Sequence, residues 1–152
     1  MILGFTGTQN GMSKMQILAF TKLMEMLQPE EFHHGVCLGA DAQAHNIVRR
    51  VSPNTIIVGH PGHDAVGENP KQATVVCDVI NSSAPYLTRN HRIVDNTDLL
   101  VATPAGNEVV RSGTWSTVRY ARGIQAPNVV IMPNGEWSAE FTGVYGEMLS
   151  EL

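Results

Sequence analysis

Glycine, threonine and serine gather in three short segments of this 152-residue sequence, Gly4–Thr8, Gly39–Asp41 and Ser112–Thr114. Glycine lets a backbone approach a phosphate closely, and the free amides of a helix N-terminus favour an anion. Each segment lies beside an apolar run, so we expect all three at one edge of a sheet. They predict a site for phosphate and sugar, with these candidates: Gly7, Thr8, Gly39, Ala40, Asp41, Ser112, Gly113 and Thr114.

Three arginines could add charge to such a site. Arg89 and Arg92 lie three residues apart and so share one helical face, and Arg111 directly precedes the third segment. A guanidinium group forks onto phosphate or carboxylate, so all three are candidate anion ligands. The alternative for the first two is a solvated helix face with ion pairs to Asp95 or Glu108.

The motifs of several common chemistries are missing. The first segment contains neither G-x-G-x-x-G nor G-x-x-x-x-G-K-[ST], which disfavours NAD redox chemistry and ATP hydrolysis. The run His60-Pro-Gly-His63-Asp64 could hold a metal, but ordinary histidines of a surface loop are the favoured interpretation. Cys37 and Cys77 lack the close spacing of metal or redox motifs and are expected as buried free thiols. We therefore expect no metal and no cofactor.

Composition narrows the partners further. The formal net charge is −4 with only 10 Lys and Arg, so no broad basic surface for nucleic acid is expected. No stretch approaches the roughly 18 consecutive apolar residues of a membrane span, and the first residues carry no basic, secretory-type leader. We expect a cytoplasmic protein that binds a small molecule, with no membrane or nucleic-acid partner.

Short apolar runs alternate with segments of helical periodicity. Strands are expected at Met1–Thr6, Gly35–Leu38, Thr55–Val58, Leu99–Thr103 and Val129–Met132, with an extra strand within Ala73–Ile80. Helices are expected from Ser13, where Ser13 and Gln16 can form a capping box, from a cap at Asp41, and over Pro85–Asn96, Thr114–Arg122 and Phe141–Leu152. This alternation predicts one α/β domain over residues 1–152, a Rossmann-like, doubly wound parallel sheet with helices on both faces. Ligands of such sheets bind beyond the carboxyl ends of the strands.

The stretch HRIVDNTDLLVATPAGNEVVRSGTWSTVRYARGIQAPNVVIMP (residues 91–133), with GFTGT and LGADAQAHNIVRR, resembles the SLOG superfamily of Rossmann-like nucleotide-binding domains. This group includes the Lonely Guy phosphoribohydrolases and the DNA-processing protein A domain. The resemblance implies a protein that binds a nucleotide or nucleotide derivative as a sensor, carrier or sequestering protein. It also implies a homodimer or higher homo-oligomer, since relatives commonly pair.

The hydrolase branch of this group has a P-G-G-x-G-T-x-x-E loop, in which glycines and Thr hold a 5′-phosphate and Glu assists N-glycosidic cleavage. Pro104, Gly113 and Thr114 match its outline, with an insertion between them. Thr117 stands at the Glu position and cannot act as an acid or base near neutral pH. Trp115 could stack on a base or fill the core, and the core is favoured. The resemblance thus implies phosphate binding without the usual catalytic group.

Two acids could act in place of the missing Glu. Glu108 lies in the inserted loop, and Asp41 lies at the same sheet edge if it is not merely a helix cap. Arg89 or Arg92 would fill the place of an arginine that the hydrolase branch carries in its preceding helix. The alternative function is therefore an N-glycosidase acting on nucleoside 5′-monophosphates or related nucleotides.

Overall fold

The computed structural model describes residues 1–152 and is built on one mostly parallel sheet of seven strands. These strands are β1 (Ile2–Gly7), β2 (Glu31–His34), β3 (Ile56–Gly59), β5 (Val79–Ile80), β7 (Leu99–Thr103), β8 (Asn128–Ile131) and β9 (Trp137–Glu140). Their order across the sheet is β5-β3-β2-β1-β7-β8-β9, and only β9 runs antiparallel to its neighbour. A separate pair is formed by β4 (Gly62–His63) and β6 (Ala84–Pro85). The predicted α/β, Rossmann-like fold is confirmed.

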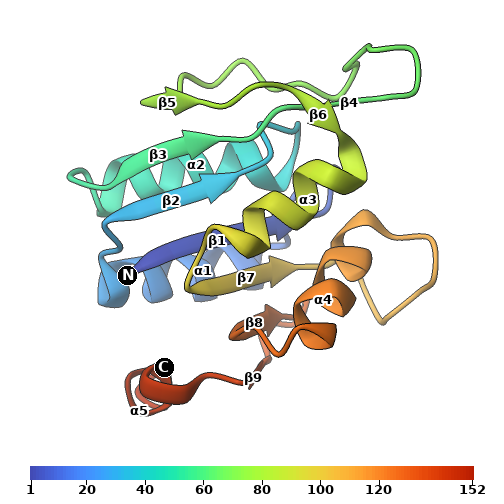
Figure 1. Cartoon of the computed structure of the whole chain (residues 1–152). Coiled ribbons are helices and arrows are strands. Elements are labelled where there is room, and N and C mark those ends of the chain that lie inside the picture. Colours follow the sequence, from blue (N-terminus) through green and yellow to red (C-terminus); the bar gives the residue numbers. More distant parts are fainter.

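Helices cover both faces of this sheet. Figure 1 shows α1 (Lys14–Leu27) and α2 (Ala40–Val51) behind it, and α3 (Tyr86–Asp95) and α4 (Gly113–Gly123) in front of it. A short 3₁₀ turn, η1 (Gly143–Tyr145), and the one-turn helix α5 (Gly146–Leu149) end the chain. No helix has both the length and the apolar character needed to cross a bilayer.

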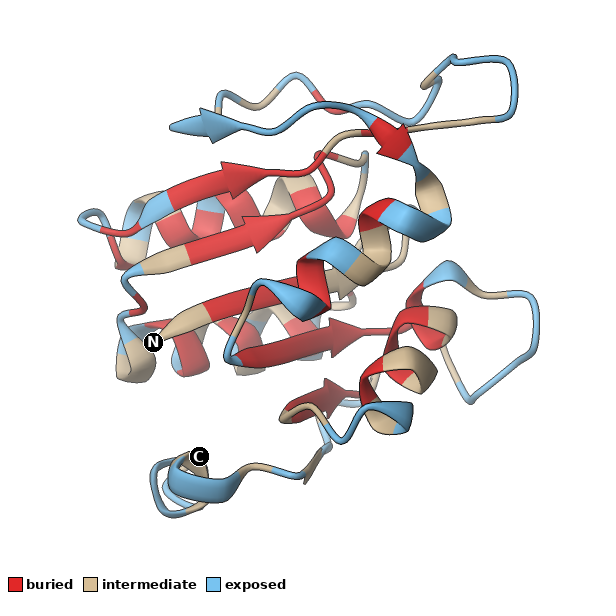
Figure 2. Ribbon diagram, viewed as in Figure 1, coloured by how far each residue is buried: buried red, intermediate tan, exposed pale blue.

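The inner strands are buried on both faces, as Figure 2 shows by their red colour. Leu99 and Val101 belong to the cluster under α1 and α2, whereas Leu100 and Ala102 belong to clusters under α3 and α4. Phe5 anchors the larger cluster, with its ring centroid 5.2 Å from that of Phe20. Apolar side chains alternate to both faces of β7, which is why its sequence LLVAT contains no polar break before Thr103.

The strand order reverses beside β1. The chain proceeds from β1 to β2 and β3 on one side, then returns to β7 and β8 on the other. The loops that follow β1, β2 and β7 therefore meet at the carboxyl edge of the sheet. A crevice at such a switch point is where open α/β sheets bind their ligands.

The capping box predicted at the start of the first helix is present. The Ser13 hydroxyl accepts the Gln16 backbone N–H, and the Gln16 side-chain oxygen accepts the Ser13 N–H at 2.9 Å. The Gln16 side-chain amide also donates to the carbonyls of Pro104 and Ile131, at 2.8 and 2.9 Å. This cap therefore ties α1 to the loop after β7 and to the end of β8.

The second strand was misplaced by the sequence prediction. The strand is Glu31–His34, and the predicted segment Gly35–Leu38 is the loop that follows it. The buried histidines of β2 pair with other histidines, and their polar side chains do not predict a buried strand. In the segment that was predicted instead, Val36 has a left-handed φ of 56°, which a strand does not allow. The prediction of Asp41 as a cap was also wrong, because Gly39 is the N-cap of α2 and Asp41 lies inside its first turn.

The C-terminal prediction needs a similar correction. The segment predicted as a helix from Phe141 contains only η1 and α5, and the antiparallel edge strand β9 before it was missed. Positive φ values at Phe141 and Gly143 interrupt a continuous helix. Of the extra strand predicted within Ala73–Ile80, only Val79–Ile80 is a strand, at the sheet edge.

Gly39 allows α2 to start against the loop that follows β1. Its φ is 81°, and a Cβ at this position would overlap the backbone of Gln9. We expect Gly39→Ala to lower the free energy of unfolding by about 2–4 kcal/mol, from the disfavoured φ and the displaced loop. Urea denaturation measures this loss. Gly123→Ala is the matched control, because nothing lies within 4 Å of its added methyl group; an equal loss in both variants would contradict the explanation.

Candidate functional site

A cleft of about 390 Å³ opens at the carboxyl edge of the sheet, where the loops after β1, β2 and β7 meet α3 and the start of α4. Its lining is mostly polar and includes Thr6, Gly7, Thr8, Gln9, Asn10, Gly35, Cys37, Asp41, Lys71, Tyr86, Arg89, Asn90, Arg111, Ser112, Gly113 and Thr114. The three segments singled out in the sequence thus converge here, as predicted from the sheet edge.

The start of α4 presents free backbone donors to the cleft. Ser112 is the N-cap, and its hydroxyl accepts the Trp115 N–H at 3.2 Å. The N–H groups of Gly113 and Thr114 meet no acceptor within the chain. Unpaired N–H groups at the positive end of a helix dipole form an anion site. Gly113 leaves open space where a side chain would otherwise begin.

The loop after β1 is held rigidly beside these donors. The Thr8 N–H donates to the Thr103 carbonyl at 3.2 Å, and the Thr8 carbonyl accepts the Ala40 N–H at 3.0 Å. A Cβ on Gly7 would lie 2.5 Å from both the Ala40 Cβ and the Thr103 Oγ1, so only glycine fits there. Gln9 and Asn10, exposed at the loop tip, complete this wall of the cleft.

Arg89 is a buried cation in the opposite wall, with 6% of its surface exposed. Its Nη1 donates to the carbonyls of Gly35 and His60 at 2.5 and 3.2 Å, and its Nε donates to the Asn90 side chain at 2.7 Å. Its Nη2 meets only the Cys37 sulfur, at 3.6 Å. Arg89 makes no ion pair within the chain. A buried guanidinium that has no ion pair, and only the nearby Asp41 charge to balance it, favours an anionic ligand.

Asp41 is the one carboxylate of the cleft lining. One of its oxygens, Oδ2, accepts the N–H groups of Gly35 and Cys37 at 3.0 and 3.1 Å, which shapes the loop after β2. Burial raises the pKa of Asp41 to about 6, although the Arg89 charge and the two backbone donors pull it down. Asp41 is therefore close to the point where it can hold or release a proton near neutral pH.

Two further cations line the cleft, and neither forms an ion pair. Lys71 comes from the long segment between β4 and β5, and Arg111 from the loop before α4. With Arg89 they make three cations against the single carboxylate of Asp41. The cleft is thus positive in a chain whose net charge is −4, which focuses anions on this edge.

Cys37 places a thiol beside Arg89 in the same cleft. Burial and the nearby Asp41 charge raise its pKa, while Arg89 acts in the opposite direction. The protonated thiol is therefore favoured, which disfavours a nucleophilic role near neutral pH. Both cysteines are free thiols and half-buried rather than fully buried.

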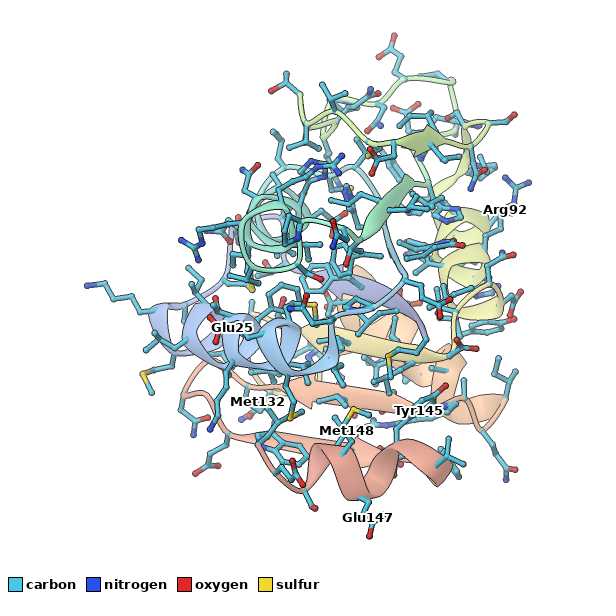
Figure 3. The ribbon with its side chains drawn as sticks, turned by 90° about the vertical axis from the view of Figure 1, so that its left-hand side faces the viewer. Glu25, Arg92, Met132, Tyr145, Glu147 and Met148 are labelled. Atoms are coloured by element: carbon cyan, nitrogen blue, oxygen red, sulfur yellow. The ribbon has the colours of Figure 1, made fainter.

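Several residues predicted for the site lie outside the lining of the cleft. Gly39 and Ala40 support it from behind the β1 loop, and the buried Pro104 offers its carbonyl to Gln16. Arg92 projects from α3 into solvent, as Figure 3 shows. Of the two arginines on this helix, only Arg89 therefore reaches the cleft.

Three predicted residues of the late loop and α4 are occupied elsewhere. Trp115 is 5% exposed in the core, and its Nε1 donates to the Gly106 carbonyl at 3.1 Å. Thr117 is 1% exposed, and its hydroxyl donates to the Gly113 carbonyl. The exposed Glu108 pairs with Arg119 and Arg122, both at 3.1 Å, and does not line the cleft. These pairs hold the inserted loop against α4.

The sequence prediction missed Lys71, Tyr86, Asn90 and Cys37. Lys71 lies in the irregular stretch 59–83, where no periodicity indicates which side chains point inward. Tyr86 and Asn90 belong to the same helix as Arg89, at offsets of three and one. Helical spacing was the available signal for Tyr86, because residues three apart share a face, whereas the adjacent Asn90 gave no such signal.

His34, His45 and Cys77 bring three potential metal-ligand atoms within 4.8 Å of one another. The hydrogen bonds have the wrong direction for a metal, however. The Val36 N–H donates to Nδ1 of His34, so the neutral ring carries its proton on Nε2, which donates to Nδ1 of His45 at 3.0 Å. The nitrogen that would bind the metal is therefore protonated, and a ligating histidine normally donates through its other nitrogen. His34 and His45 therefore form a hydrogen-bonded pair with a structural role.

Comparisons with known proteins agree on the fold alone. No family model matches the chain, and no curated protein matches it. The molybdenum cofactor binding protein from the phototrophic bacterium Rippkaea orientalis is similar, with a TM-score of 0.64 and 16% identity over 86% of this chain and 76% of that one. The protein TM1055 is similar with a TM-score of 0.55 and 17% identity, over 84% of this chain and 72% of that one.

Proposed function

We propose that this protein binds a nucleotide or nucleotide-derived ligand at the carboxyl edge of its sheet, as a sensor, carrier or sequestering protein. The observation that carries the proposal is the pair of unpartnered N–H groups on Gly113 and Thr114, which border a cleft with more cations than carboxylates. A phosphate on these amides would gain charge-assisted hydrogen bonds, with Arg111 beside it.

The rest of the cleft suits a sugar and base better than a bare anion. Thr8, Gln9 and Asn10 offer hydroxyl and amide groups along one wall, and Asp41 offers a carboxyl group that can accept from a hydroxyl. The volume of about 390 Å³ falls in the range of small-molecule sites. A fold neighbour described as a molybdenum cofactor binding protein adds support for a small-molecule ligand.

The second candidate is an N-glycosidase that cleaves the base from a nucleoside 5′-monophosphate. The observation that favours it is Asp41, a carboxyl group of the cleft with a pKa raised to about 6. A carboxyl group in this range can donate a proton to a leaving base. Because Glu108 is paired outside the cleft, Asp41 alone would supply this group.

One experiment separates the two functions. The purified protein is incubated with nucleoside monophosphates, NAD derivatives and cyclic nucleotides, and the bound fraction and the solution are analysed by mass spectrometry. An intact bound ligand is the expected result. Free base with ribose phosphate would instead establish the glycosidase, and Asp41→Asn should then abolish turnover while the ligand still binds.

Arg111 is expected to contribute charge without supporting the fold. It is exposed, lines the cleft and makes no hydrogen bond or ion pair within the chain. We expect Arg111→Ala to weaken binding of a nucleoside monophosphate by about tenfold, near 1.4 kcal/mol, with unchanged thermal stability. Calorimetry at two salt concentrations measures this. Arg50→Ala, at an exposed position on α2, is the control, and equal affinity of both variants would count against the site.

A further inference from the structure

A second cationic centre lies in the cleft, apart from the N-terminus of α4. The Lys71 ammonium and the Arg89 guanidinium both lie over the Tyr86 ring, 5.3 and 5.4 Å from its centroid. The ring is itself fixed, because its hydroxyl donates to the Asn69 side chain at 2.8 Å. Both cations therefore contact one aromatic side chain, and both line the cleft.

The one carboxylate near this pair is Asp41, whose charge interacts with that of Arg89. Neither cation forms an ion pair, and Lys71 makes no hydrogen bond with its ammonium group. Only 6% of the Arg89 surface is exposed, and its Nη2 contacts only the Cys37 sulfur. The nearest compensating group in the lining is Asp41, which is already engaged with two backbone N–H groups. Two cations without an ion pair, both beside the Tyr86 ring in the cleft, offer donors to a phosphate.

One strand of the sheet, β1, separates the two centres. Arg89 binds the carbonyl that follows β2, and α4 begins after β7, while β1 lies between these strands. Neighbouring strands lie roughly 4.8 Å apart, so the two strand ends are about 10 Å apart. Arg89 and the start of α4 line the cleft from opposite sides of β1, so a ligand that contacts both must extend across the cleft.

From this arrangement we infer that the ligand carries an anionic group at each end, as a nucleoside 3′,5′-bisphosphate does. One phosphate binds the Gly113 and Thr114 amides with Arg111, and the second binds Lys71 and Arg89. This inference rests on the proposed nucleotide-binding function and names the class of nucleotide. It assigns Lys71 as the residue that distinguishes a bisphosphate from a monophosphate.

Titration calorimetry with paired ligands tests it. The probes are the 5′-monophosphates and 3′,5′-bisphosphates of adenosine, guanosine, cytidine and uridine. For the base that binds, the bisphosphate should bind at least about tenfold more tightly than the monophosphate. Lys71→Met should remove that advantage and leave the monophosphate affinity within about twofold, because methionine keeps the apolar stem over Tyr86 without the charge. Lys14→Met, at an exposed position on α1, should leave both affinities unchanged.

The outcomes separate the two claims. Equal affinity for a monophosphate and its bisphosphate would overturn the second subsite and leave the proposed function standing. A Lys71→Met variant that loses monophosphate and bisphosphate binding alike would overturn it too, since Lys71 would then serve the first phosphate. Binding of none of the eight compounds would overturn the inference, and the proposed function would fall with it if no NAD derivative or cyclic nucleotide bound either.

Discussion

Replacing Arg89 by leucine is expected to abolish measurable ligand binding and to destabilise the fold together. The guanidinium holds the carbonyls of Gly35 and His60, and it supplies the buried positive charge of the cleft. Its loss leaves two buried acceptors unpaired, at a cost of about 3 kcal/mol, and we expect at least a 100-fold loss of affinity. Urea denaturation and calorimetry at 15 °C measure the two effects separately.

Two further variants interpret that result. Arg92→Ala removes the neighbouring arginine of the same helix, which is exposed, and should leave both stability and affinity near the wild-type values. Arg89→Lys keeps a charge without the fork and should retain part of the affinity in a folded protein. If Arg89→Lys and Arg92→Ala bound ligand equally well, a specific role for the guanidinium would be contradicted.

Acid should lower the free energy of unfolding of this protein, because two of its buried histidines have lowered pKa values. Burial lowers the pKa of His34 from 6.5 to about 3, and burial with the nearby His33 and arginine charges lowers that of His60 to about 4. Both rings therefore stay neutral when folded but take up protons when unfolded. The stability they provide is complete above pH 6.5 and falls as the pH drops toward 4.

Asp41 acts in the opposite direction over part of this range. Its pKa is raised to about 6, so the folded state binds the proton more readily than the unfolded chain, and acidification from pH 6 toward 4 returns some stability. At 1.36 kcal/mol for each pKa unit and proton, two histidines lose about 4 kcal/mol at pH 5 relative to pH 7, and Asp41 returns about 1 kcal/mol. We expect a net loss of about 3 kcal/mol at pH 5, which is a large share of the roughly 5–15 kcal/mol that stabilises a typical domain.

The pH dependence of the unfolding free energy tests this assignment more sharply than the midpoint does. Between pH 5 and 6, His60→Gln should lower the slope of the unfolding free energy against pH by about 1.4 kcal/mol per pH unit, which corresponds to about one proton. This change is expected whatever stability the substitution costs at pH 7. His63→Gln is the control, because the His63 side chain is half-exposed. Identical slopes in wild type and His60→Gln would refute the role of the buried ring.

The fold could be predicted where local signals and burial agreed. The apolar run Leu99–Thr103 has the bounds of β7, and the Ser13 capping box marks the start of α1. Prediction failed at β2, because its two histidines each bond one ring nitrogen to a histidine elsewhere in the chain and the other to a group two residues away. Hydropathy reports only the side chain, whereas burial depends on whether its hydrogen bonds are met. The edge strand β9 was also missed, because its exposed residues are not apolar enough to predict a strand.

The site could be predicted in outline and not in its details. Glycine, threonine and serine segments indicated three loops that meet at one cleft, since a parallel sheet brings the carboxyl ends of its strands together, and their role in ligand binding stays a prediction. The sequence could not distinguish Arg89 from Arg92, because their spacing is compatible with one face and only the packing of α3 decides which is buried. Lys71 lay beyond prediction, because an irregular segment carries it to the cleft.

Phosphate binding at the start of α4 is most directly tested by an NMR titration that follows the chemical shifts of the backbone amides. Nitrogen-15-labelled protein is titrated with the nucleoside monophosphate that binds most tightly in calorimetry. We expect the largest shifts on the Gly113 and Thr114 amides and on the loop from Thr8 to Asn10. Shifts gathered instead around the apolar groove that contains Met15, Leu18 and Trp137, with Gly113 and Thr114 unmoved, would contradict it.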